Sequence, residues 1–173
     1  FINTQWRGIA PGRHIICNGG SYDESGFSLA ITSNNGGALR GEFQNKDTNE
    51  KILMDISYPY DEKWHHVAMT YDAEKKEAMI YLDGKPGTVP TSFKSPFIFD
   101  PQRLRIGENE YHGMGFIGGV TDVIIWPKLL RVEAIANHAG GEISTDIGKP
   151  LLQLPLRFAN AEEARALSGK AGF

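Results

Sequence analysis

Apolar residues recur at every second position along much of the chain, in short runs that glycine and proline separate. In the run 64–71, Val67, Met69 and Tyr71 share one face, and the polar residues 72–76 follow as a loop of hairpin length. A period of two is that of a β-strand, whose successive side chains point to opposite faces of a sheet. The pattern predicts strands at 1–7, 13–18, 26–32, 38–44, 51–57, 64–71, 77–83, 102–107, 115–126 and 151–158.

Helical patterns are confined to two short segments. One covers residues 131–138, and in the other Asn160 with Glu163 three residues later is typical of a helix cap, in a turn that ends at Gly169. Residues 83–84, Asp-Gly, tolerate positive φ and predict a tight turn between strands. Many strands and little helix predict an all-β protein built from two stacked sheets.

The composition fits one domain with a sizeable core, since the chain has 173 residues and is 40% hydrophobic. Lys and Arg number 18 against 21 Asp and Glu, and a net charge of -3 argues against a nucleic-acid partner held through its phosphates. The sequence has no apolar run of the length, about 18 residues, that would predict a membrane span. Cys17 is the one cysteine, so no disulfide forms within the chain.

Several motifs occur in an order that is similar to a known family. They comprise 1–7, 26–31, 64–72, 80–85, 104–107, 116–126 and 131–135. Together these segments resemble the laminin-G-like, concanavalin A-like jelly-roll family. The resemblance implies a two-sheet antiparallel jelly-roll sandwich and a non-catalytic recognition module for carbohydrate or a cell-surface partner, secreted or held at the cell surface.

The two ends of the chain bear on its domain boundaries. The family normally opens with a strand and a glycine-rich segment ahead of the aromatic strand that 1–7 resembles, and residues 151–158 are similar to that opening strand. We therefore expect a single domain over 1–173 that is truncated at its N-terminus and belongs to a larger protein, with neighbouring domains as partners. Residues 151–173 are expected either to close this domain or to open a following repeat.

Histidine and aspartate residues in predicted strands have structural explanations. His65 and His66 are adjacent, so their side chains point to opposite faces of a strand and cannot share one metal ion. Asp122 lies in an apolar strand pattern, and the family resemblance implies a buried carboxylate that accepts hydrogen bonds.

The aromatic residues fall into two groups, those that we expect in the core and those that we expect at the surface. Trp6, Trp64 and Trp126 lie in apolar strand patterns, so we expect them in the core, Trp64 together with Val67 and Ile124. The tyrosines in polar or proline-bearing loops are better candidates to contact a ligand. They are Tyr22, Tyr58, Tyr60 and Tyr111.

The loop 108–113 is the densest polar and aromatic cluster in the sequence, and it is the first candidate for a ligand site. Its candidate ligand-binding residues are Glu108, Asn109, Tyr111 and His112. A sugar would bind by hydrogen bonds to the carboxylate and amide and by stacking on the tyrosine ring. The alternative is a solvated loop without a ligand. A second candidate is one face of the strand 38–44, where Arg40, Glu42 and Gln44 alternate.

Calcium is the one cofactor that the sequence suggests. Ca²⁺ takes oxygen ligands, and two loops are rich in them. The candidate metal ligands are Asp23, Glu24, Glu108 and Glu110.

An enzyme is the less favoured interpretation. A jelly-roll glycoside hydrolase needs carboxylates at alternate positions on one strand, as in Glu-x-Asp-x-x-Glu, and the sequence lacks that run. Two alternatives to the recognition module remain. One is a structural or assembly domain of a large surface protein, and the other is a polysaccharide hydrolase or lyase.

Overall fold

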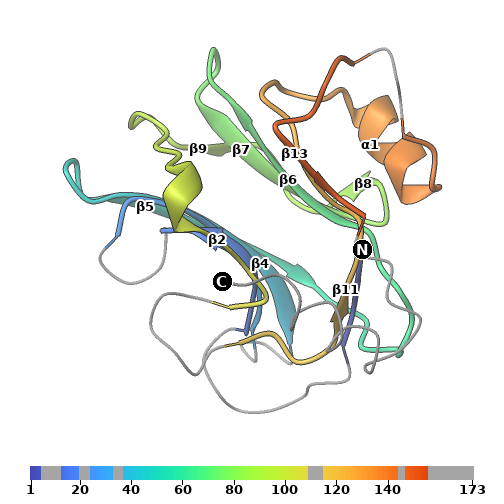
Figure 1. The fold of residues 1–173 in the computed structure, drawn as a ribbon. Helices are drawn as coiled ribbons and strands as arrows, with labels where there is room; N and C mark the ends of the chain where they lie inside the picture. Colours follow the sequence, from blue (N-terminus) through green and yellow to red (C-terminus); the bar gives the residue numbers. More distant parts are fainter. Residues whose placement is uncertain (5–12, 20–23, 33–36, 109–114, 144–146, 156–173) are drawn as a thin grey trace.

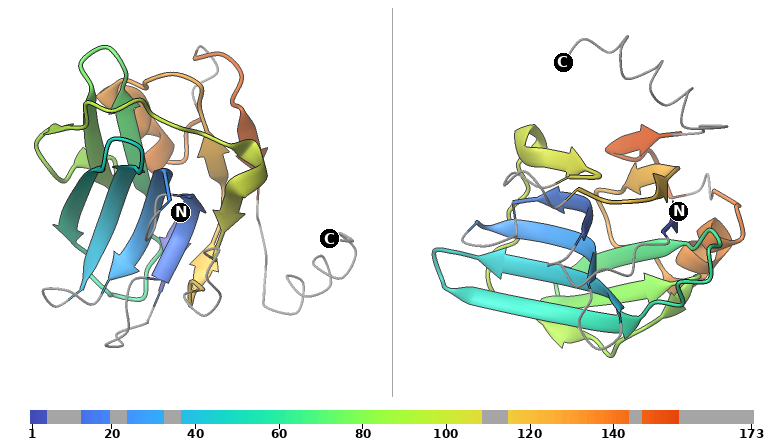
Figure 2. Two further views of the ribbon diagram at one scale, coloured as in Figure 1. Left: turned by 90° about the vertical axis from the view of Figure 1, so that its left-hand side faces the viewer. Right: turned by 90° about the horizontal axis from the view of Figure 1, so that it is seen from below.

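The described part of the protein is a sandwich of two facing β-layers, with an α-helix at its side (Figures 1 and 2). The computed structural model describes residues 1–4, 13–19, 24–32, 37–108, 115–143 and 147–155. Strands dominate this part of the chain, and every strand pair in it is antiparallel. The predicted all-β class is therefore confirmed.

The first layer is a five-stranded sheet with the order β10-β2-β3-β4-β5. The strand bounds are Arg13–Asn18 for β2, Gly26–Thr32 for β3, Ala38–Asn45 for β4, Glu50–Ser57 for β5 and Leu104–Ile106 for β10. A 3-10 turn at Pro101–Arg103 leads into β10, and its start is held by Asp100, whose side chain accepts a hydrogen bond from the Gln102 N–H. Predicted and observed strands agree closely in this sheet.

The second layer is made of shorter pieces. β6 (Val67–Asp72) and β7 (Glu77–Leu82) form a hairpin, and β8 (Lys85–Pro86) and β9 (Thr91–Ser92) both pair with β7. β1 (Ile2–Asn3) pairs with β11 (Gly119–Val120), and β12 (Val123–Ile125) pairs with β13 (Leu152–Leu154). A bridge between Ile2 and His65 connects β1 to the segment before β6.

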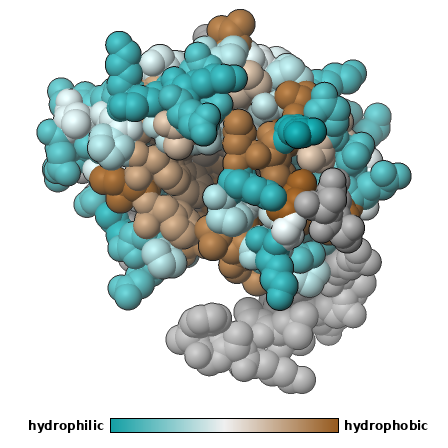
Figure 3. Space-filling view, turned by 90° about the horizontal axis from the view of Figure 1, so that it is seen from above, coloured by the Kyte–Doolittle hydropathy of each residue, from teal (hydrophilic) through white to brown (hydrophobic). Residues whose placement is uncertain are grey.

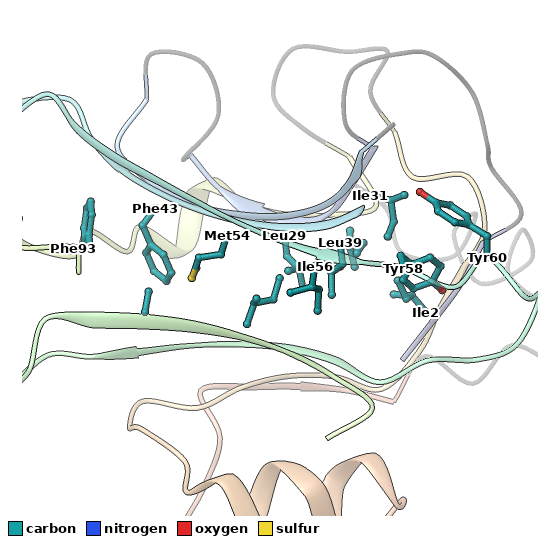
Figure 4. Packing of buried hydrophobic residues seen from close by; sticks show 13 residues of the cluster. Ile2, Leu29, Ile31, Leu39, Phe43, Met54, Ile56, Tyr58, Tyr60 and Phe93 are labelled. Atoms are coloured by element: carbon teal, nitrogen blue, oxygen red, sulfur yellow. The ribbon is translucent and has the colours of Figure 1, made fainter. Parts of the chain in front are cut away.

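One apolar cluster fills the space between the layers (Figure 4). On β4 the alternation decides which side chains enter it, because Leu39 and Phe43 are buried in the core while Arg40 and Gln44 are on the outer face. The cluster consists of Ile2, Ile15, Leu29, Ile31, Leu39, Phe43, Met54, Ile56, Tyr58, Tyr60, Ala78, Ile80 and Phe93. The period of two in the sequence therefore places the core.

The turn after β7 is the tight turn expected at Asp83-Gly84. Both residues have positive φ, 50° and 76°, which is the conformation of a primed hairpin turn. A Cβ atom at Gly84 would lie 2.8 Å from Cα of Ala136, so only glycine allows α1 (Val132–Ala139) to lie this close. The helix predicted at 131–138 is confirmed, and the predicted turn at 160–169 lies outside the described residues.

Several predicted strands are shorter in the structure, among them 102–107, which is reduced to Leu104–Ile106, and one is interrupted. The strand expected at 64–71 begins at Val67, and the one expected at 115–126 divides into β11 and β12. Asp122 causes the interruption, because its φ of +49° is incompatible with extended backbone. Its half-buried carboxylate accepts a hydrogen bond from the Thr121 hydroxyl at 3.2 Å.

Three aromatic residues differ from their expected exposure. Tyr58 and Tyr60 were expected at the surface but are only 3% and 9% exposed, and burial raises the pKa of both phenols. Trp64 was expected in the core but is 52% exposed. Val67 packs against the core as expected and Ile124 is half-buried. Trp126 is half-buried, and Trp6 and Tyr22 lie outside the described residues.

Two leucines on neighbouring strands test the layer assignment. Leu39 on β4 is 0% exposed, whereas Leu53 on β5 is 45% exposed. We expect Leu39→Ala to lower the free energy of unfolding by about 2 to 5 kcal/mol, because it leaves a cavity between the sheets. Leu53→Ala is the matched control and should change stability by less than about 1 kcal/mol. Urea denaturation measures both, and equal losses would contradict the assignment of faces.

Candidate functional site

The loop predicted as the ligand site is described only at its first residue. The backbone oxygen of Glu108 accepts a hydrogen bond from Sγ of Cys17 at 3.4 Å. The other candidates in this loop, Asn109, Glu110, Tyr111 and His112, lie outside the described residues. These residues stay a prediction.

The second predicted group lies together on the outer face of the five-stranded sheet. Arg40 binds Asp55 with both Nε and a terminal nitrogen, at 2.7 Å and 2.6 Å. Lys51 lies 2.8 Å from Glu42. Oε1 of Gln44 is buried without a partner in the described part of the chain. Arg40, Glu42 and Gln44 therefore share a face as predicted, and cross-strand partners already occupy the two charged members.

The charges on this face are balanced locally. The hydrogen bond to Asp55 raises the pKa of Arg40 above its usual value. Burial raises the pKa of Glu42, and the nearby Lys51 only partly offsets this effect. Since each charge has an opposite charge in contact, a ligand would have to replace an existing ion pair in order to bind here.

A different candidate surface, on the second layer, lies around Trp64. Its neighbour His65 pairs with Ile2, and Asn3 pairs with Gly119, so Trp64, Asn3 and Gly119 lie on adjacent segments of the second layer. A Cβ atom at Gly119 would lie 2.5 Å from the indole ring. The absence of a side chain at Gly119 therefore makes room for the ring, which packs on backbone on one side and meets solvent on the other.

Two polar residues lie next to Trp64 along the backbone, since Asn3 follows the Ile2–His65 bridge and Lys63 precedes Trp64. Nδ2 of Asn3 donates a hydrogen bond to the backbone oxygen of Glu62 at 2.7 Å. Nζ of Lys63 lies 3.5 Å from Asp61 and its side chain is largely exposed. We call Trp64, Asn3, Lys63 and Gly119 the Trp64 surface. It combines a flat apolar face with an amide and an ammonium group.

A buried histidine fixes the segment that carries Trp64. Nε2 of His65 lies 2.8 Å from Asp61, and Nδ1 lies 2.8 Å from Asp83. The second oxygen of Asp83 accepts a hydrogen bond from the backbone N–H of His66 at 3.0 Å. His65 therefore ties the loop before Trp64 to the turn after β7. The structural interpretation of the His65-His66 pair fits this arrangement.

The two carboxylates shift the pKa of His65, and His65 shifts that of Asp61. Burial alone lowers the pKa of His65, but the hydrogen bonds to Asp61 and Asp83 outweigh burial and raise it above its usual value. The hydrogen bond from His65 lowers the pKa of Asp61 to about 2. The cluster is thus most stable as an imidazolium between two carboxylates.

The structure brings no metal site together among the residues that it describes. No group of three or more His, Cys, Asp or Glu side chains in those ranges is placed to hold an ion. Glu24, one of the expected calcium ligands, pairs with Arg103 at 3.0 Å, and Asp23 and Glu110 lie outside the described ranges. In the same part of the chain, no helix has the length and apolar character needed to cross a bilayer.

A two-layer antiparallel sandwich with an exposed aromatic surface is an architecture that sugar-binding proteins share with many others. A family model described as the concanavalin A-like lectin/glucanases superfamily, of laminin-G type, matches residues 5–136. The chain belongs to this superfamily. Comparisons with curated proteins and with solved structures gave no significant match.

The sequence contains a signal for the Trp64 surface that the core assignment of Trp64 overlooked. Val67, Met69 and Tyr71 occupy odd positions and pack against the core. Trp64 stands at an even position, so a continuous strand would place its side chain on the opposite face. The cluster around His65 has no comparable signal, because Asp61 and Asp83 come together only in the folded chain.

Stability should depend on pH through the His65 cluster. Because the pKa of His65 is raised on folding, its contribution is complete below about pH 6.5 and is lost as the pH rises through the folded value. Because the pKa of Asp61 is lowered to about 2, its contribution is present above about pH 4 and is lost as the pH falls toward 2. The cluster therefore contributes most to the free energy of unfolding between about pH 4 and 6.5.

Melting curves of the wild type and His65→Gln test this dependence. Above pH 6.5 the Tm of the wild type should approach that of the variant. The difference in Tm should shrink by about 2 to 4 °C for each kcal/mol of interaction lost. His66, whose pKa burial lowers to about 4, titrates in both proteins and cancels in the difference. A constant difference in Tm from pH 5 to pH 9 would contradict the assignment.

Proposed function

We propose that the chain is a non-catalytic carbohydrate-recognition module, secreted or displayed at the cell surface, that binds a sugar on the Trp64 surface. The observation that carries this proposal is the half-exposed indole of Trp64, packed against Gly119. A tryptophan gains most by burial, so one with half its surface in water is a natural place for an apolar partner to bind. Membership of a lectin/glucanase superfamily makes a sugar the partner of choice.

The chemistry of the Trp64 surface suits a pyranose ring. The C–H groups on one side of a pyranose form an apolar face that stacks on an indole. Within the described residues the indole N–H of Trp64 donates to no acceptor, so it is able to donate to a hydroxyl group. Oδ1 of Asn3 is oriented by the bond from Nδ2 to Glu62 and is able to accept a hydrogen bond.

The surface is preorganised. His65 follows Trp64 directly, and its two carboxylate partners hold the backbone at this point. A ligand that stacks on a ring with a fixed backbone loses less conformational entropy than one that must order a free loop. The Asp61 carboxylate contacts both His65 and Lys63. Because it is engaged in these contacts, a binding role for the surface is favoured over acid catalysis.

Substitution of Trp64 tests the site. A glycan array with the wild type identifies an oligosaccharide, and calorimetry then compares Trp64→Ala with the wild type. We expect Trp64→Ala to weaken binding by about 2- to 12-fold, because a stacking contact is worth about 0.5 to 1.5 kcal/mol. Its Tm should stay within a few degrees, since half of the ring is already in water.

Trp126→Ala is the matched control for that experiment. Trp126 is half-buried, and its ring centroid lies 5.8 Å from that of His138 on α1. This substitution should lower Tm and leave the affinity of the folded protein unchanged. Unaltered affinity in Trp64→Ala would contradict the proposal. It would favour as sugar site either the loop that begins at Glu108 or the face of β4 that carries Arg40, Glu42 and Gln44. No binding to any glycan would favour an assembly domain.

Calcium remains a separate expectation for the loops at Asp23 and Glu108. Because carboxylates of the loops would be brought together by a bound ion, Ca²⁺ in excess should raise Tm relative to EDTA. Mg²⁺ is the control, because it prefers a smaller, octahedral site. Identical melting curves in Ca²⁺ and EDTA would rule out a stabilising calcium site.

A further inference from the structure

The five-stranded sheet ends at one side in a long edge strand. β5 (Glu50–Ser57) has eight residues, and among the described residues it pairs only with β4. The strand at the other side of this sheet, β10, has three residues. Figure 2 shows β5 at one side of the first layer. Because every second peptide group of an edge strand points away from its neighbour, β5 presents N–H and C=O groups with which another strand can pair.

The outward side chains of β5 form a pattern that is complementary to itself. Met54 and Ile56 are buried in the core, so the alternate residues Lys51, Leu53 and Asp55 lie on the outer face. Leu53 is 45% exposed, with a positive charge two residues before it and a negative charge two residues after it. An edge strand with charges of one sign repels a second copy of itself. On β5 the two signs lie equally far along the strand from Leu53.

This pattern selects one register for two antiparallel β5 strands. With a two-fold axis at Leu53, this leucine lies opposite its own copy, and Lys51 of each strand lies opposite Asp55 of the other. Both charged pairs are then attractive, and the two leucines cover each other between them. An axis at Ile52 or Met54 would instead place Leu53 opposite a charged side chain. The register centred on Leu53 is therefore favoured.

Pairing of two β5 edges adds to the ion pairs that already lie on this face. Arg40 binds Asp55 at 2.6 Å, and Lys51 lies 2.8 Å from Glu42. These pairs stay in place, because an ammonium group has three donors and a carboxylate accepts hydrogen bonds at both oxygens. Across the interface the pair that contains Asp55 meets the pair of the second copy that contains Lys51, so that four charges alternate in sign. Such a network contributes more than an isolated surface ion pair.

The β5 edge specifies its partner more closely than an apolar opening in the second layer does. There a cavity of about 930 Å³ lies beside β6 and β12, and apolar surface surrounds this hollow in Figure 3. The side chains that line it include Ile15, Leu29 and Phe43, which suit many apolar partners. The β5 edge instead combines peptide groups that can pair, an apolar centre and two opposite charges. A second copy of the chain matches all three features at once.

We propose that two copies of the chain form a dimer by antiparallel pairing of their β5 edges, with Leu53 at the two-fold axis. The two five-stranded sheets then become one continuous sheet, and the outer-face charges Lys51 and Asp55 determine the register. The Trp64 surface belongs to the other layer of the sandwich. This proposal is therefore independent of sugar binding.

Two charge-reversal variants of the full chain test the dimer and its register. Lys51→Glu places two carboxylates at each charged pair of the interface, and Asp55→Lys places two ammonium groups there. Each variant alone should dimerise about tenfold or more weakly than the wild type. In an equimolar mixture the heterodimer has opposite charges at both positions, so its affinity should return to near that of the wild type. Lys85→Glu, at an exposed position on β8, is the control and should dimerise as the wild type does.

Analytical ultracentrifugation over a range of concentrations measures dimerisation of each chain and of the mixture. Recovery in the mixture supports the proposal and separates it from misfolding, because two misfolded chains would not regain affinity when mixed. A wild type that stays monomeric at about 1 mM would overturn the proposal and would leave the β5 edge to a strand of another protein. A dimer that neither reversal weakens would overturn it too, since another surface would then form the interface. So would a mixture that dimerises no better than the separate variants.

Discussion

The burial of one apolar cluster between two sheets is the interaction on which the rest of the structure depends. Leu39 and Phe43 of β4 and Ile80 of β7 belong to this one cluster, which lies between the two layers (Figure 4). Each inward side chain fixes the register of its strand, because a shift by one residue would place polar groups in the core. Register in turn decides which residues meet on the outer faces.

That dependence explains why the strands were predictable and part of the site was not. β2 and β3 match their predicted bounds because alternation and flanking turn residues agree there. The break at Asp122 could not be predicted, since a positive φ in a residue other than glycine is set by the surrounding fold. Tyr58 and Tyr60 resemble surface loop residues in the sequence, but their rings pack against each other at 5.0 Å inside the cluster.

The outer faces depend on partners that the sequence does not identify. The spacing of Arg40, Glu42 and Gln44 predicts one shared face, and the structure places them on it. Asp55 lies directly opposite Arg40 on β5 and neutralises it, a pairing that follows only from the register of the two strands. In the same way Asn3 and Gly119 come beside Trp64 only through long-range pairing of β1. A residue type can be predicted to be exposed, but its neighbours require the fold.

We propose that the chain recognises sugar through the Trp64 surface. The most direct measurement is an NMR titration of the isotope-labelled chain with the strongest oligosaccharide from the array. We expect the largest shifts at the indole N–H of Trp64 and at the amides of Asn3 and Gly119, and little change at Arg40 and Gln44 on the other sheet. The largest shifts on β4, with an unmoved Trp64 indole, would contradict it.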